Sequence, residues 1–152
     1  MTVTVDIANL GFGLVILVFA GLMIAILVMG WGRVRRWIAS RKFDAKDLAS
    51  MRRRWEEIES LSRQPGEMGR KMAIMEADKL LDSALKTMMF AGNTLGERLK
   101  VACYRWPEMC QVWWAHKIRN QLAHESSFHL DRSVAARALR SYRSALRLMG
   151  VL

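Results

Sequence analysis

The stretch EMGRKMAIMEADKLLDSALKTMMF, residues 67–90, decides the fold of this chain. Its apolar residues recur every three or four positions, which is the spacing of one face of a helix, whereas a strand would show strict alternation. Gly92 and Asn93 follow the stretch and are expected to stop the helix. We therefore expect a helix over residues 67–90 with a buried face made of Ile74, Ala77, Leu81, Leu85 and Met88.

The same periodicity continues on both sides of this stretch. A helix is expected over residues 44–62, ended by a turn at residues 64–66. A short helix opens with Thr94 and Glu97, which form a capping box, and another covers residues 108–123. A last helix opens at the N-cap Asp131 and closes at Gly150. Residues 44–152 thus predict an all-α fold, a bundle of four or five helices.

The N-terminal part of the chain has a different composition. Residues 10–31 carry no charge, and at 1.5 Å per residue they would reach roughly 33 Å, enough to cross a hydrocarbon core. The run lacks a basic leader and is too long for a usual signal peptide, so it predicts a single transmembrane helix. Residues 1–9 would be a short extracytoplasmic tail, and residues 32–43 a basic juxtamembrane linker.

The charges predict how the chain would lie in the membrane. There are 24 Lys+Arg against 14 Asp+Glu, a net charge of +10, and every basic residue lies beyond Trp31. This pattern excludes a multi-pass protein and predicts an inner-membrane protein with its N-terminus outside and residues 44–152 in the cytoplasm. Arg33, Arg35 and Arg36 have two interpretations. They either retain this topology, which the positive-inside rule favours, or contact anionic lipid or RNA.

No motif for a cofactor or a metal ion is present in the sequence. Cys103 and Cys110 are the only cysteines, and they have no histidines at zinc-ligand spacing. We expect both to be buried thiols, because the cytoplasm keeps cysteines reduced. Phosphate-binding loops and metalloprotease helices are also missing, so no cofactor and no metal site are expected.

Residues 113–125, WWAHKIRNQLAHE, are more polar than an ordinary bundle helix. His116, Asn120 and His124 are spaced four apart, so they form one stripe if the helix reaches His124, and Arg119 lies beside His116. An imidazole can transfer a proton, and a guanidinium can hold a phosphate and stabilise added negative charge. The cluster therefore suits metal-free cleavage of an RNA phosphodiester, with His116 and Glu125 in supporting positions.

The same residues have a structural interpretation. His116 would be a core histidine whose hydrogen bonds are satisfied, and Arg119 would pair with Asp78 or Glu76 of the helix at 67–90. Asn120 and His124 would then cap the end of their own helix. Spacing alone leaves both interpretations open.

The segment from Arg119 through Asn120 to His124 resembles the signature of the HEPN superfamily, an Arg followed by four to six residues and a His, often with Asn directly after the Arg. Residues 73–82 are similar to the long early helix of HEPN bundles, and the resemblance covers roughly residues 67–152. The resemblance implies that the chain contains a HEPN-like helical domain. Many members of this superfamily are metal-independent endoribonucleases, so this activity is implied as well. Arg119 and His124 would be the catalytic pair, supported by Asn120.

The resemblance also implies a homodimer in which the two motif helices, here residues 108–123, face each other across a cleft that admits RNA. Many members do not cleave RNA and act as RNA-binding or interaction modules. Two hypotheses follow for this chain. The first is a membrane-anchored ribonuclease or RNA-binding module. The second is a non-enzymatic membrane-tethered interaction protein in which Arg119, Asn120 and His124 belong to a structural network.

Overall fold

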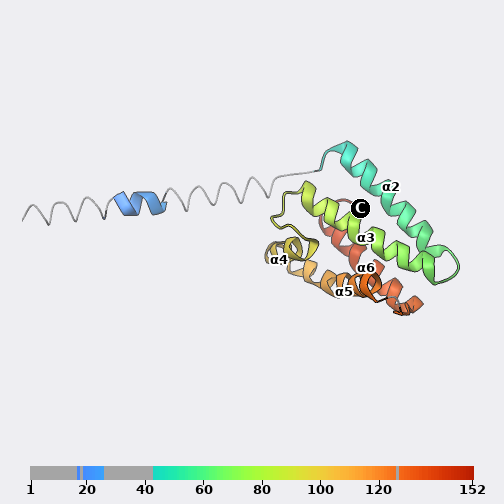
Figure 1. Ribbon diagram of the computed structural model, residues 1–152. Coiled ribbons are helices and arrows are strands. Elements are labelled where there is room, and N and C mark those ends of the chain that lie inside the picture. The colour runs from blue at the N-terminus through green and yellow to red at the C-terminus, as the bar shows by residue number, and fades with distance from the viewer. Residues whose placement is uncertain (1–16, 18, 26–42, 126) are drawn as a thin grey trace, which may run out of the picture. The chain divides into compact units, whose positions relative to one another are not determined.

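The computed structural model describes residues 17, 19–25, 43–125 and 127–152 (Figure 1). Lys42–Leu152 form one compact unit. Its regular elements are all helical, which confirms the all-α prediction for the described part of the chain. They are α2 (Ala45–Arg63), α3 (Glu67–Thr87), α4 (Leu95–Arg105), the 3₁₀ turn η1 (Pro107–Gln111), α5 (Val112–His124) and α6 (Arg132–Leu148).

Only part of the predicted transmembrane run lies among the described residues. Residues 17 and 19–25 are helical, and large apolar side chains such as Phe19 and Ile24 are exposed. The rest of residues 10–31, the tail and nearly all of the basic linker, with Arg33, Arg35 and Arg36, lie outside the described residues. Within the described residues, no helix combines the length and the apolar character needed to cross a membrane. The membrane anchor therefore stays a prediction.

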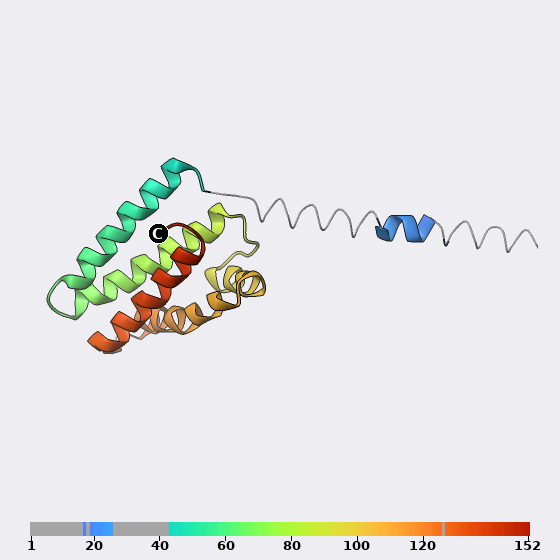
Figure 2. The ribbon, with the colours of Figure 1, turned by 180° about the vertical axis from the view of Figure 1, so that it is seen from behind.

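Helix α3 is the centre of the bundle. It contacts α2, α4, α5 and α6, and the other helices surround it in both views (Figure 1 and Figure 2). The face predicted from its periodicity is the buried one, because all five expected residues are buried. Helix α2 packs on α3 through Met51, Trp55 and Ile58, and α6 packs through residues that include Ala138, Tyr142 and Leu146.

Helix α3 ends at Thr87, three residues earlier than expected. Met89 adopts a left-handed conformation with φ 60°, and its N–H donates to the carbonyl oxygen of Lys86 at 2.8 Å. The Phe90 N–H donates to the carbonyl oxygen of Leu85 at 3.0 Å, which completes a Schellman motif. Glycine is the usual residue at the left-handed position after a helix, and here Met89 occupies it. The sequence therefore predicted the end of the helix at Gly92, which is too late. At the end of α6 the same motif forms with Gly150, as predicted.

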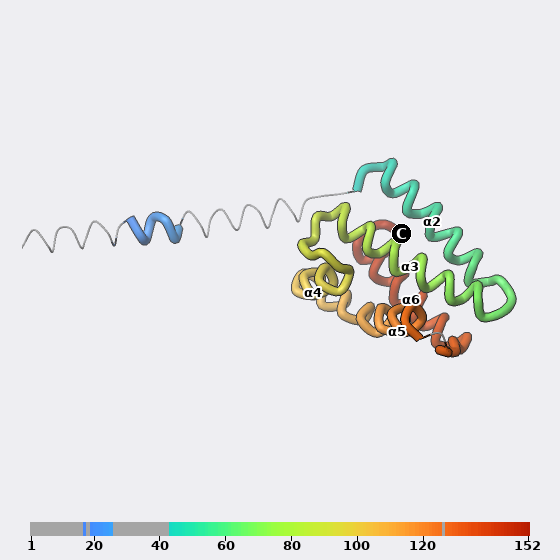
Figure 3. Tube along the Cα trace, viewed as in Figure 1, coloured from blue at the N-terminus to red at the C-terminus, as the bar shows by residue number. Residues whose placement is uncertain are grey.

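The segment between α4 and α5 differs from the prediction. A 3₁₀ turn at Pro107–Gln111 precedes α5, so the regular helix begins at Val112 instead of at residue 108. Figure 3 traces the course of the chain from α4 into α5. Cys103 and Cys110 are joined by a disulfide, with Cys103 half-buried and Cys110 exposed. The expectation of two buried thiols is therefore wrong. In the 3₁₀ turn the buried position belongs to Met109, and the next residue, Cys110, lies on the outside.

Glu67 fixes the segment that joins α5 to α6. Its Oε1 accepts hydrogen bonds from Lys71 Nζ and from the Leu130 N–H, each at 2.8 Å. Its Oε2 lies 2.8 Å from His129 Nδ1. The hydrogen bond from Lys71, followed by that from Leu130, lowers the pKa of Glu67 to about 2.

We expect Glu67 to make folding sensitive to acid. Because its folded pKa lies below the ordinary value of 4.5, its stabilising effect is full above that value and is lost as the pH falls towards about 2. Glu67→Gln should therefore flatten the dependence of the melting temperature on pH within this window. The control is Glu57→Gln, an exposed glutamate without a partner among the described residues. Identical pH profiles for wild type and Glu67→Gln would contradict this expectation.

Candidate functional site

The stripe predicted on the fourth helix does form. Helix α5 continues to His124, so His116, Asn120 and His124 follow one another at successive turns. Their exposure differs along the stripe, because His116 is buried, Asn120 is half-buried and His124 is exposed. The polar groups nearest the start of the helix thus face the core, and the last one faces solvent.

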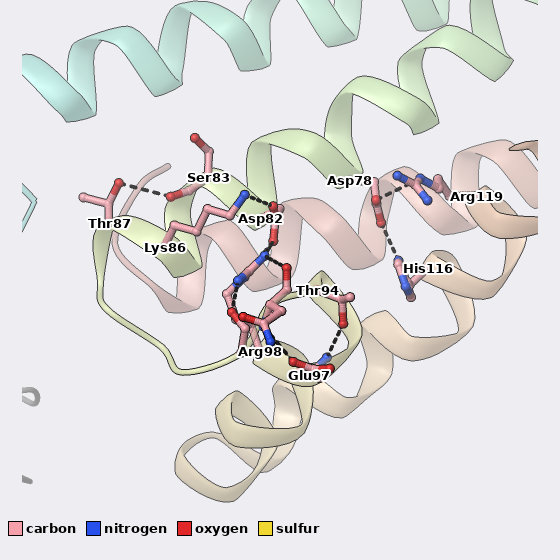
Figure 4. A network of polar contacts seen from close by, with 12 residues as sticks. Asp78, Asp82, Ser83, Lys86, Thr87, Thr94, Glu97, Arg98, His116 and Arg119 are labelled. Carbon is pink, nitrogen blue, oxygen red and sulfur yellow. Dashed lines mark hydrogen bonds and ion pairs between the residues drawn. The ribbon is translucent and has the colours of Figure 1, made fainter.

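Asp78 of α3 lies where the core meets this stripe and is only 2% exposed. Tyr142 of α6 donates its hydroxyl hydrogen bond to Asp78 Oδ1 at 2.9 Å, and His116 Nδ1 lies 2.7 Å from the same oxygen. Arg119 Nε forms an ion pair with Oδ2 at 3.0 Å (Figure 4). A carboxylate can be buried only when its charge and lone pairs are compensated, and here α5 and α6 supply the compensation.

Asn120 closes these contacts into a ring. Arg119 Nη1 donates to Asn120 Oδ1 at 2.9 Å, and Asn120 Nδ2 lies 3.3 Å from His116 Nε2. A carboxylate can only accept, so Nδ1 of His116 carries the proton shared with Asp78, and Nε2 of the same ring is in contact with the Asn120 amide. We call Asp78, His116, Asn120 and Arg119 the Asp78 ring. Both nitrogens of its imidazole are occupied by neighbours.

Tyr142 supports the Asp78 ring from α6. Burial, together with the charge and the hydrogen bond of Asp78, raises the pKa of Tyr142 far above its ordinary value. The hydroxyl therefore keeps its proton and remains a donor to Asp78 at any physiological pH. This contact ties α6 to α3 at the same point where α5 is tied to it.

A second ion pair, between a buried arginine and a half-buried aspartate, lies one turn further along α3. Arg98 of α4 is 4% exposed, and its Nε donates to Asp82 Oδ1 at 2.8 Å. The same guanidinium donates to the carbonyl oxygens of Gly92 and Asn93, so it holds the loop before α4 (Figure 4). Burial raises the pKa of Asp82, and the hydrogen bonds and charges of Lys86 and Arg98 lower it by more. The pKa of Asp82 therefore lies below its ordinary value.

A cavity of about 460 Å³ lies beside both clusters, between α3, α4 and α5. Its lining is mostly polar and combines four cationic side chains with two carboxylates. The cations are Lys79, Lys86, Arg98 and Arg119, and each of them also pairs with a carboxylate of α3. The cavity could hold a small anionic group, but most of its positive charge is already compensated from within the chain.

The structure brings together some of the predicted site residues and separates others. Arg119, Asn120 and His116 belong to one ring, whereas His124 and Glu125 are exposed and do not line the cavity. Among the described residues, neither of these two side chains has a hydrogen-bond or ion-pair partner. At 3.6 residues per turn, five positions place Arg119 and His124 roughly 140° apart around α5. Within one chain, the expected catalytic pair does not share a pocket.

Sequence reasoning named Asp78 only as one possible partner of Arg119 and missed the Asp82–Arg98 pair and Tyr142. A signal was present, because Asp78 and Asp82 stand four residues apart in a helix that is otherwise apolar on its buried side. Two carboxylates one turn apart on such a helix require cationic partners from neighbouring helices. The arginines of α4 and α5 are those partners.

Comparison of the chain with family models, with curated proteins and with solved structures found no match. The resemblance to the HEPN superfamily therefore rests on residues 119–124 and on the helical setting of that motif.

Proposed function

We propose that the bundle of α2–α6 is a non-enzymatic interaction module, tethered to the inner membrane by residues 10–31 and facing the cytoplasm. The observation that carries this proposal is the Asp78 ring. It engages both nitrogens of His116 and two nitrogens of Arg119, with Asp78 itself 2% exposed. The contacts of His116 and Arg119 with Asp78 hold α5 on α3, and the hydrogen bond from Tyr142 to Asp78 holds α6 on α3.

The ring is poorly suited to proton transfer on a bound substrate. A general base needs a free nitrogen within hydrogen-bond reach of the substrate, and His116 Nε2 is already occupied by the Asn120 amide. The other candidate imidazole, His124, has no carboxylate to orient it among the described residues. In this proposal His116, Arg119 and Asn120 stabilise the fold, and the exposed His124 lies outside the ring.

The proposal predicts stability effects in place of catalytic effects. Arg119→Ala or Asn120→Ala should lower the free energy of unfolding by about 1–3 kcal/mol, because each leaves buried polar partners unsatisfied. The matched control is Lys117→Ala, an exposed change on the same helix, which should be nearly neutral. Urea unfolding followed by circular dichroism measures the difference, and RNA incubated with the full-length protein in EDTA should stay intact. Neutral Arg119 and Asn120 variants would overturn the proposal.

A metal-independent ribonuclease of the HEPN kind is the second candidate. It is favoured by the exposure of His124 at the end of α5 and by the 29% exposure of the Arg119 side chain, which leave both accessible to RNA or to a second copy of the chain. Since the two lie on different sides of one α5, the catalytic pair would have to form across a homodimer through this helix. Asn120 would position Arg119.

The ribonuclease has a distinct experimental signature. Full-length protein in neutral lipid nanodiscs would cleave RNA in EDTA and leave cyclic phosphate ends. His124→Ala would abolish cleavage and leave the melting temperature unchanged, because this side chain has no partner among the described residues. Cleavage of equal rate by wild type and His124→Ala would remove this candidate. RNA binding alone would not support it, because a chain of net charge +10 binds RNA through charge at low salt.

A further inference from the structure

The exposed face of α6 carries a row of arginines. Its buried face is apolar and packs on the core, and no acidic residue occurs between Arg132 and Leu148. All five arginines of this helix are exposed. We call them the arginine strip: Arg132, Arg137, Arg140, Arg143 and Arg147.

The strip runs along one side of α6. At 100° per residue its members fall within an arc of roughly 140°, and at 1.5 Å per residue they extend over roughly 22 Å of the helix. The residues between them on this face are small, namely Ser133, Ala136 and Ser144. A plane of negative charge can therefore approach the helix closely along its whole length.

Part of the strip is compensated within the chain and part is not. Arg143 pairs with Glu59 of α2 at 2.6 Å, and Arg137 stacks on the ring of Trp114 with 4.3 Å between its guanidinium carbon and the ring centre. Arg132, Arg140 and Arg147 have no hydrogen-bond or ion-pair partner among the described residues. Like charges one turn apart on a helix repel each other, so an external anionic partner would relieve this repulsion.

We infer that the arginine strip binds the phosphate headgroups of an anionic lipid bilayer. A guanidinium binds phosphate oxygens with two parallel hydrogen bonds, and a row of guanidiniums along one side of a helix can contact several headgroups at once. The apolar face of α6 is used by the core, so the contact is electrostatic and involves no insertion into the acyl chains. Its strength depends on the content of anionic lipid and falls with salt.

Nucleic acid fits the strip less well than lipid. Proteins that bind single strands combine positive charge with aromatic rings on which bases stack. The rings nearest the strip are not free, because Trp55 is 5% exposed and Trp114 is covered by Arg137. The strip thus offers contacts to phosphate without a platform for bases.

The predicted anchor would strengthen this contact. A linker of residues 32–43 can extend roughly 40 Å, so the bundle would stay within reach of the headgroups and each encounter would be intramolecular. The strip itself belongs to the bundle, and its affinity for lipid does not require the anchor or the function proposed above. It can therefore be tested on a second membrane added in solution.

The test uses full-length protein in neutral phosphatidylcholine nanodiscs, mixed with separate vesicles and analysed by flotation. Vesicles with about one third phosphatidylglycerol should bind the protein, and pure phosphatidylcholine vesicles should not. The triple variant Arg132→Gln, Arg140→Gln, Arg147→Gln should lower the partition coefficient on the order of tenfold or more. The matched triple removes three exposed charges elsewhere, Arg53→Gln, Lys100→Gln and Lys117→Gln, and should change it less than about twofold.

Each outcome decides the inference. If both triple variants lost vesicle binding equally, the attraction would come from net charge alone and the inference would be overturned. Unchanged vesicle binding by the strip triple would also overturn the inference. If the strip triple lost binding to a labelled RNA oligonucleotide and kept binding to vesicles, the partner would be nucleic acid and the inference would be wrong. Melting temperatures of both triples verify that the bundle is intact, since all six side chains are exposed.

Discussion

Replacing Asp78 with alanine is expected to lower the free energy of unfolding by about 3–5 kcal/mol, the largest effect of any polar substitution in the bundle. The carboxylate is 2% exposed, pairs with Arg119 and is the hydrogen-bond partner of His116 and Tyr142. Its removal leaves a guanidinium without its anion and an imidazole and a phenol without their acceptor. Urea unfolding at neutral pH, followed by circular dichroism, measures the loss.

Two further variants separate the negative charge of Asp78 from its role as a hydrogen-bond acceptor. Asp78→Asn keeps an oxygen that accepts from Tyr142 but loses the ion pair with Arg119, so its loss should lie between those of wild type and Asp78→Ala. Asp78→Ala combined with Arg119→Ala should be less destabilising than the sum of the single changes, because the unpaired cation is also removed. The control is Glu56→Ala, an exposed change on α2. A loss below about 1 kcal/mol for Asp78→Ala would show that the ring does not stabilise the fold.

Arg98→Ala is expected to lower the free energy of unfolding by about 2–4 kcal/mol. The guanidinium is 4% exposed, and besides Asp82 it binds two carbonyl oxygens of the loop that leads into α4. The loss should be smaller than for Asp78, because Asp82 keeps its ion pair with Lys86 at 2.7 Å. Thermal unfolding measures the effect on the whole bundle.

Hydrogen exchange shows where the Arg98 variant acts. The amides at the start of α4 should exchange faster in Arg98→Ala than in wild type, whereas those in the middle of α3 should follow the global stability. Arg98→Lys should recover only part of the loss, because an ammonium lacks the planar fork that binds several acceptors at once. Lys100→Ala, an exposed change on the same helix, is the control. If Lys100→Ala increased the exchange rate at the start of α4 as much as Arg98→Ala does, the role assigned to Arg98 would be contradicted.

The architecture of the bundle was predictable because it follows from helical periodicity. The buried face of α3 was read from five residues, and each is buried. The turn after α2 and the end of α6 were also predictable, since Gly66 and Gly150 adopt the positive φ values that favour glycine. The end of α3 was not, because Met89 takes the left-handed position without being a glycine.

The candidate site was predicted only in part, for a geometric reason. The spacing of His116, Asn120 and His124 specifies one stripe on a helix, but it does not specify which end of the stripe meets another helix. The partner, Asp78, lies 38 residues before His116, and no local rule connects the two. The motif assigned Arg119 to His124, and the structural interpretation assigned it to Asp78 or Glu76. In the fold it is Asp78 that engages Arg119.

The disulfide between Cys103 and Cys110 bears on the side of the membrane that the bundle occupies. Cytosolic glutathione and thioredoxin keep an exposed cysteine pair reduced, whereas the periplasm oxidises it. If the bundle faces the cytosol, as the arginines after the span predict, this bond is open in the living cell and closes after lysis in air. The oxidation state of Cys103 and Cys110, trapped by rapid acid quenching, therefore reports on which side of the membrane the bundle lies.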